Sequence, residues 1–386
     1  MLKSKLVSVV ILGGTLWVLS PAQVLFSFEN DLQDFTSTGA TLSQSTFGAT
    51  HGNFSMEVSW NGGFTWLNRG TAPGIAGVLA NNRVLLADVT LLSNTGLNWS
   101  NFIVSFNDPA GWRQTNYGPF YLPRLAGTRT VLMDLRPLAA PDPNAPWFQL
   151  NIGVNAPAAR NFYLDNIRPL DESRTVQLFD FESDLHGFTP QDADIQLSQS
   201  TDWASTGSSS MRVEWVNGFN WAFNGGNSAA VANTLNQGKL LIMDVYVPPD
   251  SQQGSWWNMI LSFNDPGGWR QENDAMGFPT QPGVYTVAID YRSVAPTDYS
   301  QGWFYINLGF NSASGPAILY IDNVRVLLDT VPGDVNGDGC VDDADLLAVL
   351  FAFGGTGSEL PEDLNGDSVV DDADLLIVLF NFGTGC

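Results

Sequence analysis

The sequence repeats itself over a long interval, and this constrains its fold more than any other feature. The segment at 105–114, SFNDPAGWRQ, recurs at 262–271 as SFNDPGGWRQ, and LSQST at 42–46 recurs at 197–201. These intervals of 157 and 155 residues far exceed the roughly 20–50 residues of solenoid units. The repeat therefore predicts two tandem domains of one fold rather than an array of small units.

We place the first copy at residues 23–170 and the second at 176–327, with a very short linker between them. Short segments that alternate between apolar and polar residues, such as 56–60 and its twin 211–215, lie between turns rich in Gly, Pro, Asn and Asp. This period of two is typical of half-buried strands. We detect no helical period within the copies. The sequence predicts a mainly β protein with two tandem β-sandwich domains, and we favour a jelly roll for each.

The first 22 residues have the composition of a secretory signal peptide. Lys3 and Lys5 precede an apolar stretch from Leu6 to Leu19, and Ser-Pro-Ala ends at Ala22. A positive start, a short apolar segment and small residues at the end are typical of a cleaved signal. We expect residues 1–22 to be removed and the mature chain to be secreted, without a membrane span. An uncleaved anchor is the alternative.

The net charge of −23 is concentrated at one end of the chain. Residues 329–386 hold 13 acidic residues and no Lys or Arg, so this tail carries −13 and the rest −10. The absence of any basic stripe argues against a nucleic-acid partner.

Two twelve-residue loops in this tail, 334–345 and 363–374, place side-chain oxygens at positions 1, 3, 5, 9 and 12. This is the spacing of EF-hand calcium loops, since Ca²⁺ takes about six to eight oxygen ligands. Position 7 supplies a backbone carbonyl, here from Cys340 or Val369. The predicted ligands of two calcium ions are Asp334, Asn336, Asp338, Cys340, Asp342 and Asp345, and Asp363, Asn365, Asp367, Val369, Asp371 and Asp374.

An apolar, helix-length run follows each loop, at 346–353 and 375–382, and each run stops at a glycine. This duplicated loop–helix unit, at residues 333–386, resembles a type I dockerin. The resemblance implies an α-helical calcium module that docks an exported bacterial protein onto a cohesin-like or other partner in a polysaccharide-degrading complex. Ser368 departs from the pattern, because glycine is usual at loop position 6. Apolar helix surfaces argue against a cellulosomal cohesin as the partner.

Cysteine usage and helix composition add two expectations for this module. The only cysteines, Cys340 and Cys386, both lie in it, and export permits a disulfide between them. Such a bond would join the ends of the module, where dockerins often clasp their termini; two free thiols are the alternative. The two helices are apolar all round, so we expect part of their surface to contact a partner domain or the second sandwich.

Each copy also resembles the galactose-binding-like jelly rolls that serve as carbohydrate-binding modules. The resemblance rests on an opening Phe-Glu at 28–29, a Gly-Ser-Ser-Ser-Met strand at 207–211 and a closing Tyr-x-Asp-Asn-x-Arg strand. It implies one structural calcium ion per copy. The ligands would be Glu29 with Asp165, and Glu182 with Asp322. Alternatively, these acids cap turns or pair with Arg168 and Arg325.

Aromatic residues make up 12% of the chain, with 13 Trp. A glycan site needs flat aromatic rings for the apolar faces of sugars and amide groups for their hydroxyls. The Asp-Pro-x-Gly-Trp-Arg-Gln turn offers both, since its Trp and Gln point to one face of the following strand. Plugging the end of the sandwich is an equal alternative for this Trp, and core packing is favoured for Trp66 and Trp221. The candidate ligand-binding residues are Trp112, Gln114, Trp269, Gln271, Trp66 and Trp221.

The other tryptophans divide into core and surface expectations. Trp60 and Trp215 continue an apolar strand face and are expected in the core. Trp147 and Trp303 open strands; for these two we favour the core, with the lining of a groove as the alternative. A last group lies near polar loops and would extend a ligand surface: Trp99, Trp256 and Trp257.

The sequence gives little support for an enzyme. Its two histidines, His51 and His186, lie at non-equivalent positions outside any catalytic motif. A glycosidase needs only two carboxylates, so catalysis stays open. We favour a secreted, non-catalytic polysaccharide-binding protein with a docking module. A structural or adhesive surface protein and a polysaccharide-active hydrolase or lyase are the alternatives.

Overall fold

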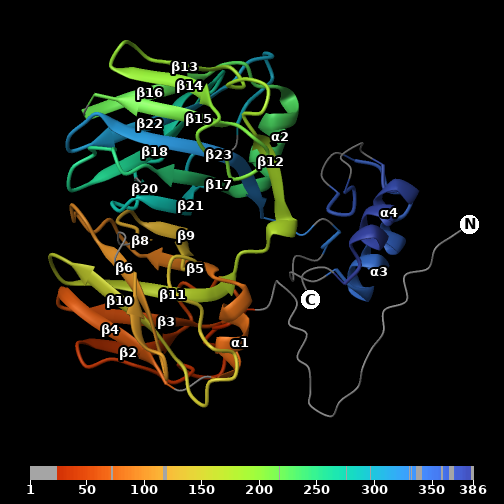
Figure 1. Ribbon diagram of the computed structural model, residues 1–386. Coiled ribbons are helices and arrows are strands. Elements are labelled where there is room, and N and C mark those ends of the chain that lie inside the picture. Colours follow the sequence, from red (N-terminus) through yellow and green to blue (C-terminus); the bar gives the residue numbers. More distant parts are fainter. Residues whose placement is uncertain are drawn as a thin grey trace, which may run out of the picture.

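The computed structural model contains two β-sandwiches and a small helical module (Figure 1). It describes residues 24–70, 73–115, 120–216, 218–274, 276–295, 297–329, 331, 333–335, 341–357, 360–364 and 369–383. The expected signal peptide and disulfide, and the calcium ligands Asn336, Asp338, Cys340, Asn365 and Asp367, lie outside these residues. Within them, no helix is long and apolar enough to cross a membrane.

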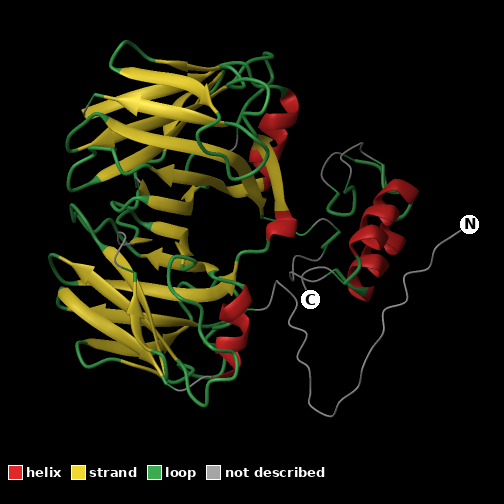
Figure 2. Ribbon diagram, in the orientation of Figure 1, coloured by secondary structure: helices red, strands yellow, loops and turns green. Residues whose placement is uncertain are grey.

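The first sandwich consists of two antiparallel sheets that pack face to face (Figure 2). One sheet has the order β1-β4-β10-β6-β7, with β8 also paired to β6, and the other has the order β2-β3-β11-β5-β9. The strands are β1 (Phe35–Thr36), β2 (Ala40–Ser45), β3 (Ser55–Trp60), β4 (Gly63–Arg69), β5 (Val84–Leu91), β6 (Asn101–Asp108), β7 (Gly111–Gln114), β8 (Phe120–Tyr121), β9 (Gly127–Asp134), β10 (Gln149–Ala156) and β11 (Arg160–Pro169).

The second sandwich repeats this strand order. Its sheets run β13-β16-β22-β18-β19, with β20 on β18, and β14-β15-β23-β17-β21, with β12 on β23. The strands are β12 (Thr175–Phe179), β13 (Phe188–Pro190), β14 (Ile195–Ser200), β15 (Ser210–Trp215), β16 (Gly218–Asn224), β17 (Gly238–Val247), β18 (Trp257–Asp265), β19 (Gly268–Gln271), β20 (Met276–Gly277), β21 (Gly283–Asp290), β22 (Tyr305–Ser312) and β23 (Ala317–Leu328). The expectation of a mainly β protein with sandwich domains is confirmed.

The expectation that the copies lack helices is wrong. Each copy has one nine-residue helix: α1 (Pro73–Asn81) lies between β4 and β5, and α2 (Ala229–Gln237) lies between β16 and β17. Ser228 caps α2, and only Ala232 and Leu235 of that helix are buried. Two inward positions are too few to reveal a helical period in the sequence.

The sandwich cores follow from strand alternation. In β3 and its twin β15, alternate side chains point inward and end on Trp60 and Trp215, which are 4% and 1% exposed. Both tryptophans are therefore core residues, as expected. Burial of a side chain this large stabilises the fold by roughly 2–3 kcal/mol.

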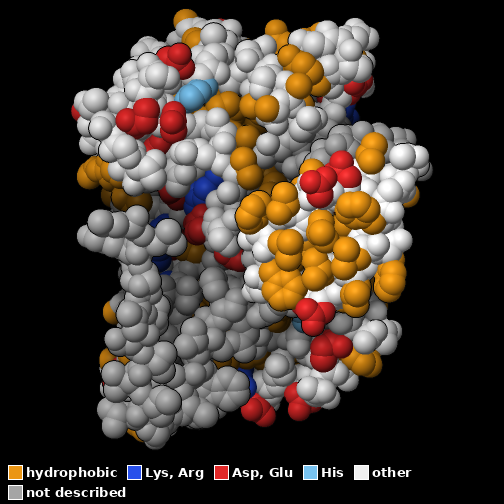
Figure 3. All heavy atoms as spheres, turned by 90° about the vertical axis from the view of Figure 1, so that its right-hand side faces the viewer, with side chains coloured by type: hydrophobic (Ala, Val, Ile, Leu, Met, Phe, Trp, Pro, Cys, Tyr) orange, Lys and Arg blue, Asp and Glu red, His pale blue; other side chains and the backbone are white. Residues whose placement is uncertain are grey.

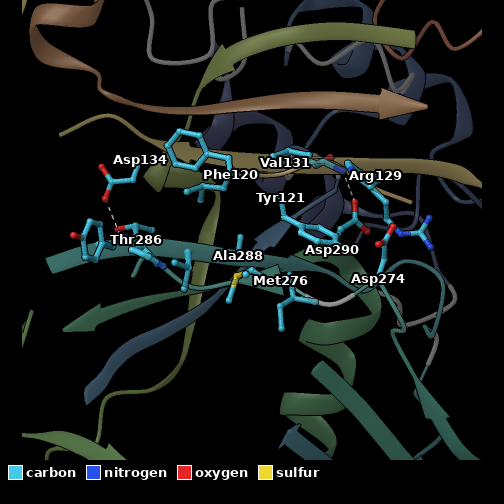
Figure 4. Close-up of a pocket in the computed structure, with 18 residues that line it drawn as sticks. Phe120, Tyr121, Arg129, Val131, Asp134, Asp274, Met276, Thr286, Ala288 and Asp290 are labelled. Carbon is cyan, nitrogen blue, oxygen red and sulfur yellow. Dashed lines mark hydrogen bonds between the residues drawn. The ribbon is translucent and has the colours of Figure 1, made fainter. Parts of the chain in front are cut away.

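The two sandwiches meet edge to edge through strands β9 and β21. The backbone N–H of Thr130 donates to Asp290 (2.7 Å), and that of Thr286 donates to Asp134 (2.8 Å). Because each contact has a reciprocal twin, the strands run antiparallel about a pseudo-twofold axis. Carboxylates thus accept edge N–H groups that would otherwise be open to pairing with another chain. Figure 4 shows Asp134 and Thr286 beside a small cavity of ≈ 70 Å³ at this interface.

Arginines reinforce this interface from both sides. Arg136 pairs with Asp134 (2.6 Å) and also donates to the Thr286 hydroxyl across the interface (2.6 Å). Arg292 likewise pairs with Asp290 and donates to the Thr130 hydroxyl (2.7 Å). The symmetry of these contacts indicates a fixed relative position for the two copies.

The linker between the copies is structured. It forms a short 3-10 turn, η1 (Glu172–Arg174), which Asp171 caps by accepting the N–H of Ser173. Arg174 donates to the carbonyls of Leu328 and Asp329 at the end of the second copy. The linker is therefore tied to the second sandwich rather than loose.

The C-terminal module has two helices, α3 (Asp343–Ala352) and α4 (Asp372–Asn381). Each helix begins with a capping box formed by the loop's ninth and twelfth residues, both Asp. The side chain of each of these two residues accepts the backbone N–H of the other. Five buried valines form its core, and an isolated bridge joins Thr356 to Val369. The helices start three residues before the apolar runs, because the acidic loop residues already belong to the first turn. They end close to Gly354 and Gly383, whose φ values are positive.

Candidate functional site

Aromatic side chains gather on the outer face of the β1-β4-β10-β6-β7 sheet. Strand alternation turns Phe64 and Trp66 of β4 away from the core, because Thr65 and Leu67 point inward. The hairpin register places Trp112 of β7 opposite Asn107 of β6, on the same face. The Trp66 ring lies 5.0 Å from that of Phe64 and 5.1 Å from that of Trp112, edge to face in both cases. These three rings are called the first aromatic face below.

The second copy carries an equivalent second aromatic face, formed by Phe219, Trp221 and Trp269. The Trp221 ring lies 4.9 Å from Phe219 and 5.1 Å from Trp269. Trp112 and Trp269 are 46% and 45% exposed, so neither plugs the end of its sandwich. Core packing of Trp66 and Trp221 is also wrong, since both lie half-buried on the outer face.

A glycine beneath the rings makes each arrangement possible. A Cβ on Gly153 of β10 would lie 2.8 Å from the Phe64 ring and 2.9 Å from the Trp66 ring. A Cβ on Gly309 of β22 would meet Phe219 at 2.6 Å and Trp221 at 2.8 Å. Since these distances are too short for any side chain, only glycine lets the rings lie across the sheet. Sequence reasoning missed these residues, although a glycine within a strand is a known signal of close approach.

Amide side chains border the rings and hold them in place. The indole N–H of Trp112 donates to Gln114 Oε1 (2.9 Å), and that of Trp269 donates to Gln271 Oε1 (3.1 Å). The predicted Trp–Gln pairs are thus brought together in both copies. In β22 of the second copy, the side-chain N–H of Asn307 donates to the Ser262 hydroxyl (3.0 Å). The buried Oδ1 of Asn307 has no hydrogen-bond partner among the described residues.

An ion pair fixes the hairpin that carries each exposed tryptophan. Arg113 donates to both oxygens of Asp108 (2.9 and 2.7 Å), and Arg270 does the same with Asp265 (2.9 and 2.6 Å). The hydrogen bond from Arg113 lowers the pKa of Asp108 despite the opposing effect of burial. Burial acts to raise the pKa of Asp265, but Arg270 and two backbone N–H groups outweigh it, and the pKa is lowered.

The two aromatic faces differ in extent. Tyr305 in the second copy stands where the first has Gln149, and its ring lies 6.2 Å from that of Trp303. Trp303 and Tyr305 are 37% and 38% exposed. The expectation that Trp303 is a core residue is therefore wrong, while its twin Trp147 is half-buried. Trp257, expected at a ligand surface, is 2% exposed and is also a wrong prediction.

The acids expected to bind calcium in the sandwiches accept backbone N–H groups. Glu29 accepts from Phe54 (2.8 Å), and Asp165 Oδ2 accepts from His51 (2.9 Å). Their twins Glu182 and Asp322 cap the corresponding loop in the second copy. Pairing with Arg168 and Arg325 is wrong, because these arginines bind Asp88 and Glu172 instead.

Asp165 retains one feature that suits a cation. Its Oδ1 is buried without a hydrogen-bond partner among the described residues, and burial raises the pKa of this carboxyl. In Asp322 the corresponding oxygen accepts the N–H of Asn323 (2.7 Å). The described residues contain no group of three or more His, Cys, Asp or Glu side chains arranged to hold a metal. Calcium in the sandwiches therefore stays a prediction.

The described residues of the C-terminal loops are ordered around the two helix starts. Asp345 accepts the N–H groups of Val335 (2.7 Å) and Asp342 (2.9 Å), and Asp374 makes the equivalent contacts in the second loop. Both carboxylates are buried. Carboxylate oxygens of this kind are ligands that a hard cation such as Ca²⁺ prefers, and calcium binding by the module stays a prediction.

No family model and no curated protein matches the sequence. Among solved structures, a tandem of two family 22 carbohydrate-binding modules from Paenibacillus barcinonensis Xyn10C is 13% identical. It covers 81% of this chain and 99% of its own, with a TM-score of 0.29. A family 22 module of Clostridium thermocellum Xyn10B is 16% identical over 41% of this chain and 97% of its own, with a TM-score of 0.30.

A family 11 carbohydrate-binding module of the Clostridium thermocellum cellulase Lic26A-Cel5E is 10% identical. It covers 40% of this chain and 94% of its own, with a TM-score of 0.29. At such TM-scores these similarities carry no weight for function, which has to follow from the side chains. Those side chains define a class: a tandem β-sandwich protein with one exposed aromatic face per copy.

Proposed function

We propose that this is a secreted, non-catalytic polysaccharide-binding protein whose aromatic faces hold the glycan. The carrying observation is the duplicated arrangement of solvent-exposed rings beside amide groups on a rigid sheet. Flat rings offer stacking surfaces to the apolar faces of sugars, and the amides offer hydrogen bonds to hydroxyls. Trp112 and Trp269 are the most exposed tryptophans of the two faces, at 46% and 45%. His186 has a structural contact, since its ring lies 3.1 Å from the backbone N of Phe181.

The test is binding of the mature protein, with calcium, to a panel of insoluble and soluble polysaccharides. Trp112→Ala/Trp269→Ala should strongly weaken retention on whichever polysaccharide class holds the parent protein. Phe47→Ala is the matched control, because Phe47 is equally exposed at 46% but packs on Tyr163 of the other sheet. If the parent protein binds no polysaccharide, the structural or adhesive alternative takes its place. Release of reducing sugar would instead favour the enzyme alternative.

We further propose that the C-terminal module is a calcium-dependent docking element. Its surface carries a symmetric apolar patch, visible on the face turned to the viewer in Figure 3. Phe351 and Phe380 are 85% and 82% exposed, so neither is covered by the second sandwich. The docking patch consists of Leu347, Leu350, Phe351, Phe353, Leu376, Leu379, Phe380 and Phe382.

Calcium would neutralise the acidic loops and fix both helix starts, so that docking and metal binding are linked. Addition of EGTA should reduce helical circular dichroism and abolish capture of a cohesin-like partner. Phe351→Ser/Phe380→Ser should lose the partner but keep calcium binding. A calcium-loaded module that neither binds the dye ANS nor captures a partner would contradict the proposal.

A further inference from the structure

A cleft of ≈ 510 Å³ lies between the two sandwiches, and no ring of the two aromatic faces lines it. Its volume is within the roughly 300–1,000 Å³ of ligand sites in proteins. Residues from both copies line it, so neither copy forms it alone. The residues used below are Trp99, Asn101, Tyr121 and Arg124 of the first copy and Trp256 and Asn258 of the second.

Two equivalent tryptophans meet in this cleft. Trp99 and Trp256 are 157 residues apart, the interval of the sequence repeat, and each lies just before the strand that enters the aromatic sheet. They are 41% and 47% exposed. The pseudo-twofold contact of β9 with β21 brings the same corner of each copy to the interface, where β8 also contacts β20. The cleft thus offers exposed aromatic rings, as the two aromatic faces do.

Amide groups accompany these rings. Asn101 and Asn258 are also a repeat pair and line the cleft. Side-chain amides of this kind offer hydrogen bonds to the hydroxyl groups of a ligand.

The walls of the cleft are held rigid from behind. Buried Arg160 donates to the Ser100 hydroxyl and to the Pro123 carbonyl (2.5 Å each), which ties together the two segments of the first wall. In the second wall, the indole N–H of Trp257 donates to Pro279 (2.8 Å). A preformed site of this kind loses little conformational entropy on binding.

The charge in the cleft is internally balanced. Arg124 pairs with Asp274 of the second copy (3.4 Å), and its backbone N–H donates to the same carboxylate (2.7 Å). The same guanidinium lies 5.1 Å from the Tyr121 ring centre and donates to Asn98 (2.7 Å). The only charged side chain that lines the cleft within the described residues is thus compensated, which favours a neutral ligand over an anionic one.

From this combination we infer that the cleft is a third carbohydrate site, assembled by both copies, for a segment of a neutral glycan. The inference rests on the proposed polysaccharide-binding function and adds a site to it. The glycan would stack on Trp99 and Trp256 and hydrogen-bond to the amides of Asn101 and Asn258. Because the walls come from different copies, the site exists only in the tandem protein.

The test compares two pairs of substitutions in the full mature protein. Binding of neutral xylan, mixed-linkage β-glucan and galactomannan oligosaccharides is measured by calorimetry, with polygalacturonate as the anionic arm. For the oligosaccharide that the parent protein binds, Trp99→Ala/Trp256→Ala should remove one site of three and weaken binding to the long polymer by roughly tenfold. Trp99→Phe/Trp256→Phe should restore most of the affinity, because a ring is retained.

Each outcome separates this inference from the proposed function. If Trp99→Ala/Trp256→Ala leaves stoichiometry and affinity unchanged while Trp112→Ala/Trp269→Ala abolishes binding, the cleft is not a site but the function stands. If binding survives in the latter variant and is lost in the former, the cleft is supported and the faces are not. A parent protein that binds none of the neutral probes, or only polygalacturonate, overturns the inference. Thermal midpoints of all variants show whether they fold, and ligand-induced quenching of fluorescence in Trp112→Ala/Trp269→Ala tests the cleft without altering it.

Discussion

At the scale of single residues, each aromatic face depends on positions that contact no ligand. Gly153 and Gly309 provide the space in which the rings lie. The Asp108–Arg113 and Asp265–Arg270 pairs hold the hairpins that present the exposed tryptophans. The rings form the binding surface. The glycines and the Asp–Arg pairs determine whether the rings are held in one fixed arrangement.

Alanine at the glycine beneath the first face should therefore impair binding without unfolding the protein. In Gly153→Ala the new Cβ would push Phe64 and Trp66 off the sheet, while the strand backbone is compatible with alanine. We expect weaker binding by the first copy in calorimetry and a thermal midpoint within a few degrees of the parent. Gly77→Ala in α1 is the control, because a Cβ there would meet no atom within 4 Å. Equal binding in both variants would show that the ring positions do not matter.

The hairpin ion pairs predict a pH dependence of stability. The pKa of Asp108 is lowered by Arg113, so its stabilising effect is complete above the ordinary aspartate pKa of about 3.9 and is lost as pH falls through the lower folded value. Thermal midpoints of the parent protein and Asp108→Asn should differ at pH 6 and converge toward pH 2. Asp31→Asn, at an exposed turn, should differ little from the parent at any pH. A difference that is constant with pH would mean that the charge is not the stabilising feature.

At the scale of elements, strands β9 and β21 decide how the copies are joined. Their edges are linked through carboxylates and arginines rather than through a backbone ladder. The buried Asp134 and Asp290 each accept an edge N–H and also bind an arginine. This arrangement is specific to one register, because shifting the strands by one residue would separate every reciprocal pair.

Removing one carboxylate should loosen this junction. Asp134→Ala would leave the Thr286 N–H without its acceptor and Arg136 without its partner, at a cost of about 1–3 kcal/mol, the lower end applying because Arg136 is half-exposed. We expect a lower thermal midpoint and a larger radius of gyration in solution scattering. Asp142→Ala, which removes a local turn contact to Asn144, is the control. An unchanged radius of gyration would show that other contacts suffice to hold the copies together.

At the scale of the whole molecule, the pseudo-twofold axis relates the aromatic faces as well as the edge strands. Antiparallel edge strands imply an axis perpendicular to the sheets. The sheets that carry the two faces therefore lie on the same side of the molecule, as the positions of β4, β10 and β6 and of β16, β22 and β18 show (Figure 1). Rotation about this axis reverses any direction that lies in the plane of the sheets. A linear glycan has distinct ends, and two such chains bound in the same way to the two faces would therefore run in opposite directions.

This polarity is measurable with an oligosaccharide that carries a spin label at its reducing end. With one labelled oligosaccharide on each face, the label should broaden the NMR signals of equivalent residues in the two copies. These residues lie at opposite ends of the molecule. An unlabelled oligosaccharide of the same length serves as the reference. Broadening confined to one end of the molecule would instead indicate a single chain that crosses both copies in one direction.

The sequence by itself determined the duplicated β domains, the in–out alternation of their strands and the Trp–Gln pairs of the hairpins. Each of these depends on neighbouring residues within a strand or turn, and local period and turn chemistry reveal such features. The exposure of Trp303 and the burial of Trp257 did not follow from the sequence, because both depend on which strands and loops lie alongside.

Only the tertiary structure decided the close approach of Trp66 to Trp112, the reciprocal junction of β9 with β21 and the cleft that contains Trp99 and Trp256. These features join residues that are far apart in the chain, and in the last two cases they join different copies. No local pattern records such a contact, since it exists only once two sheet edges have met in a particular register.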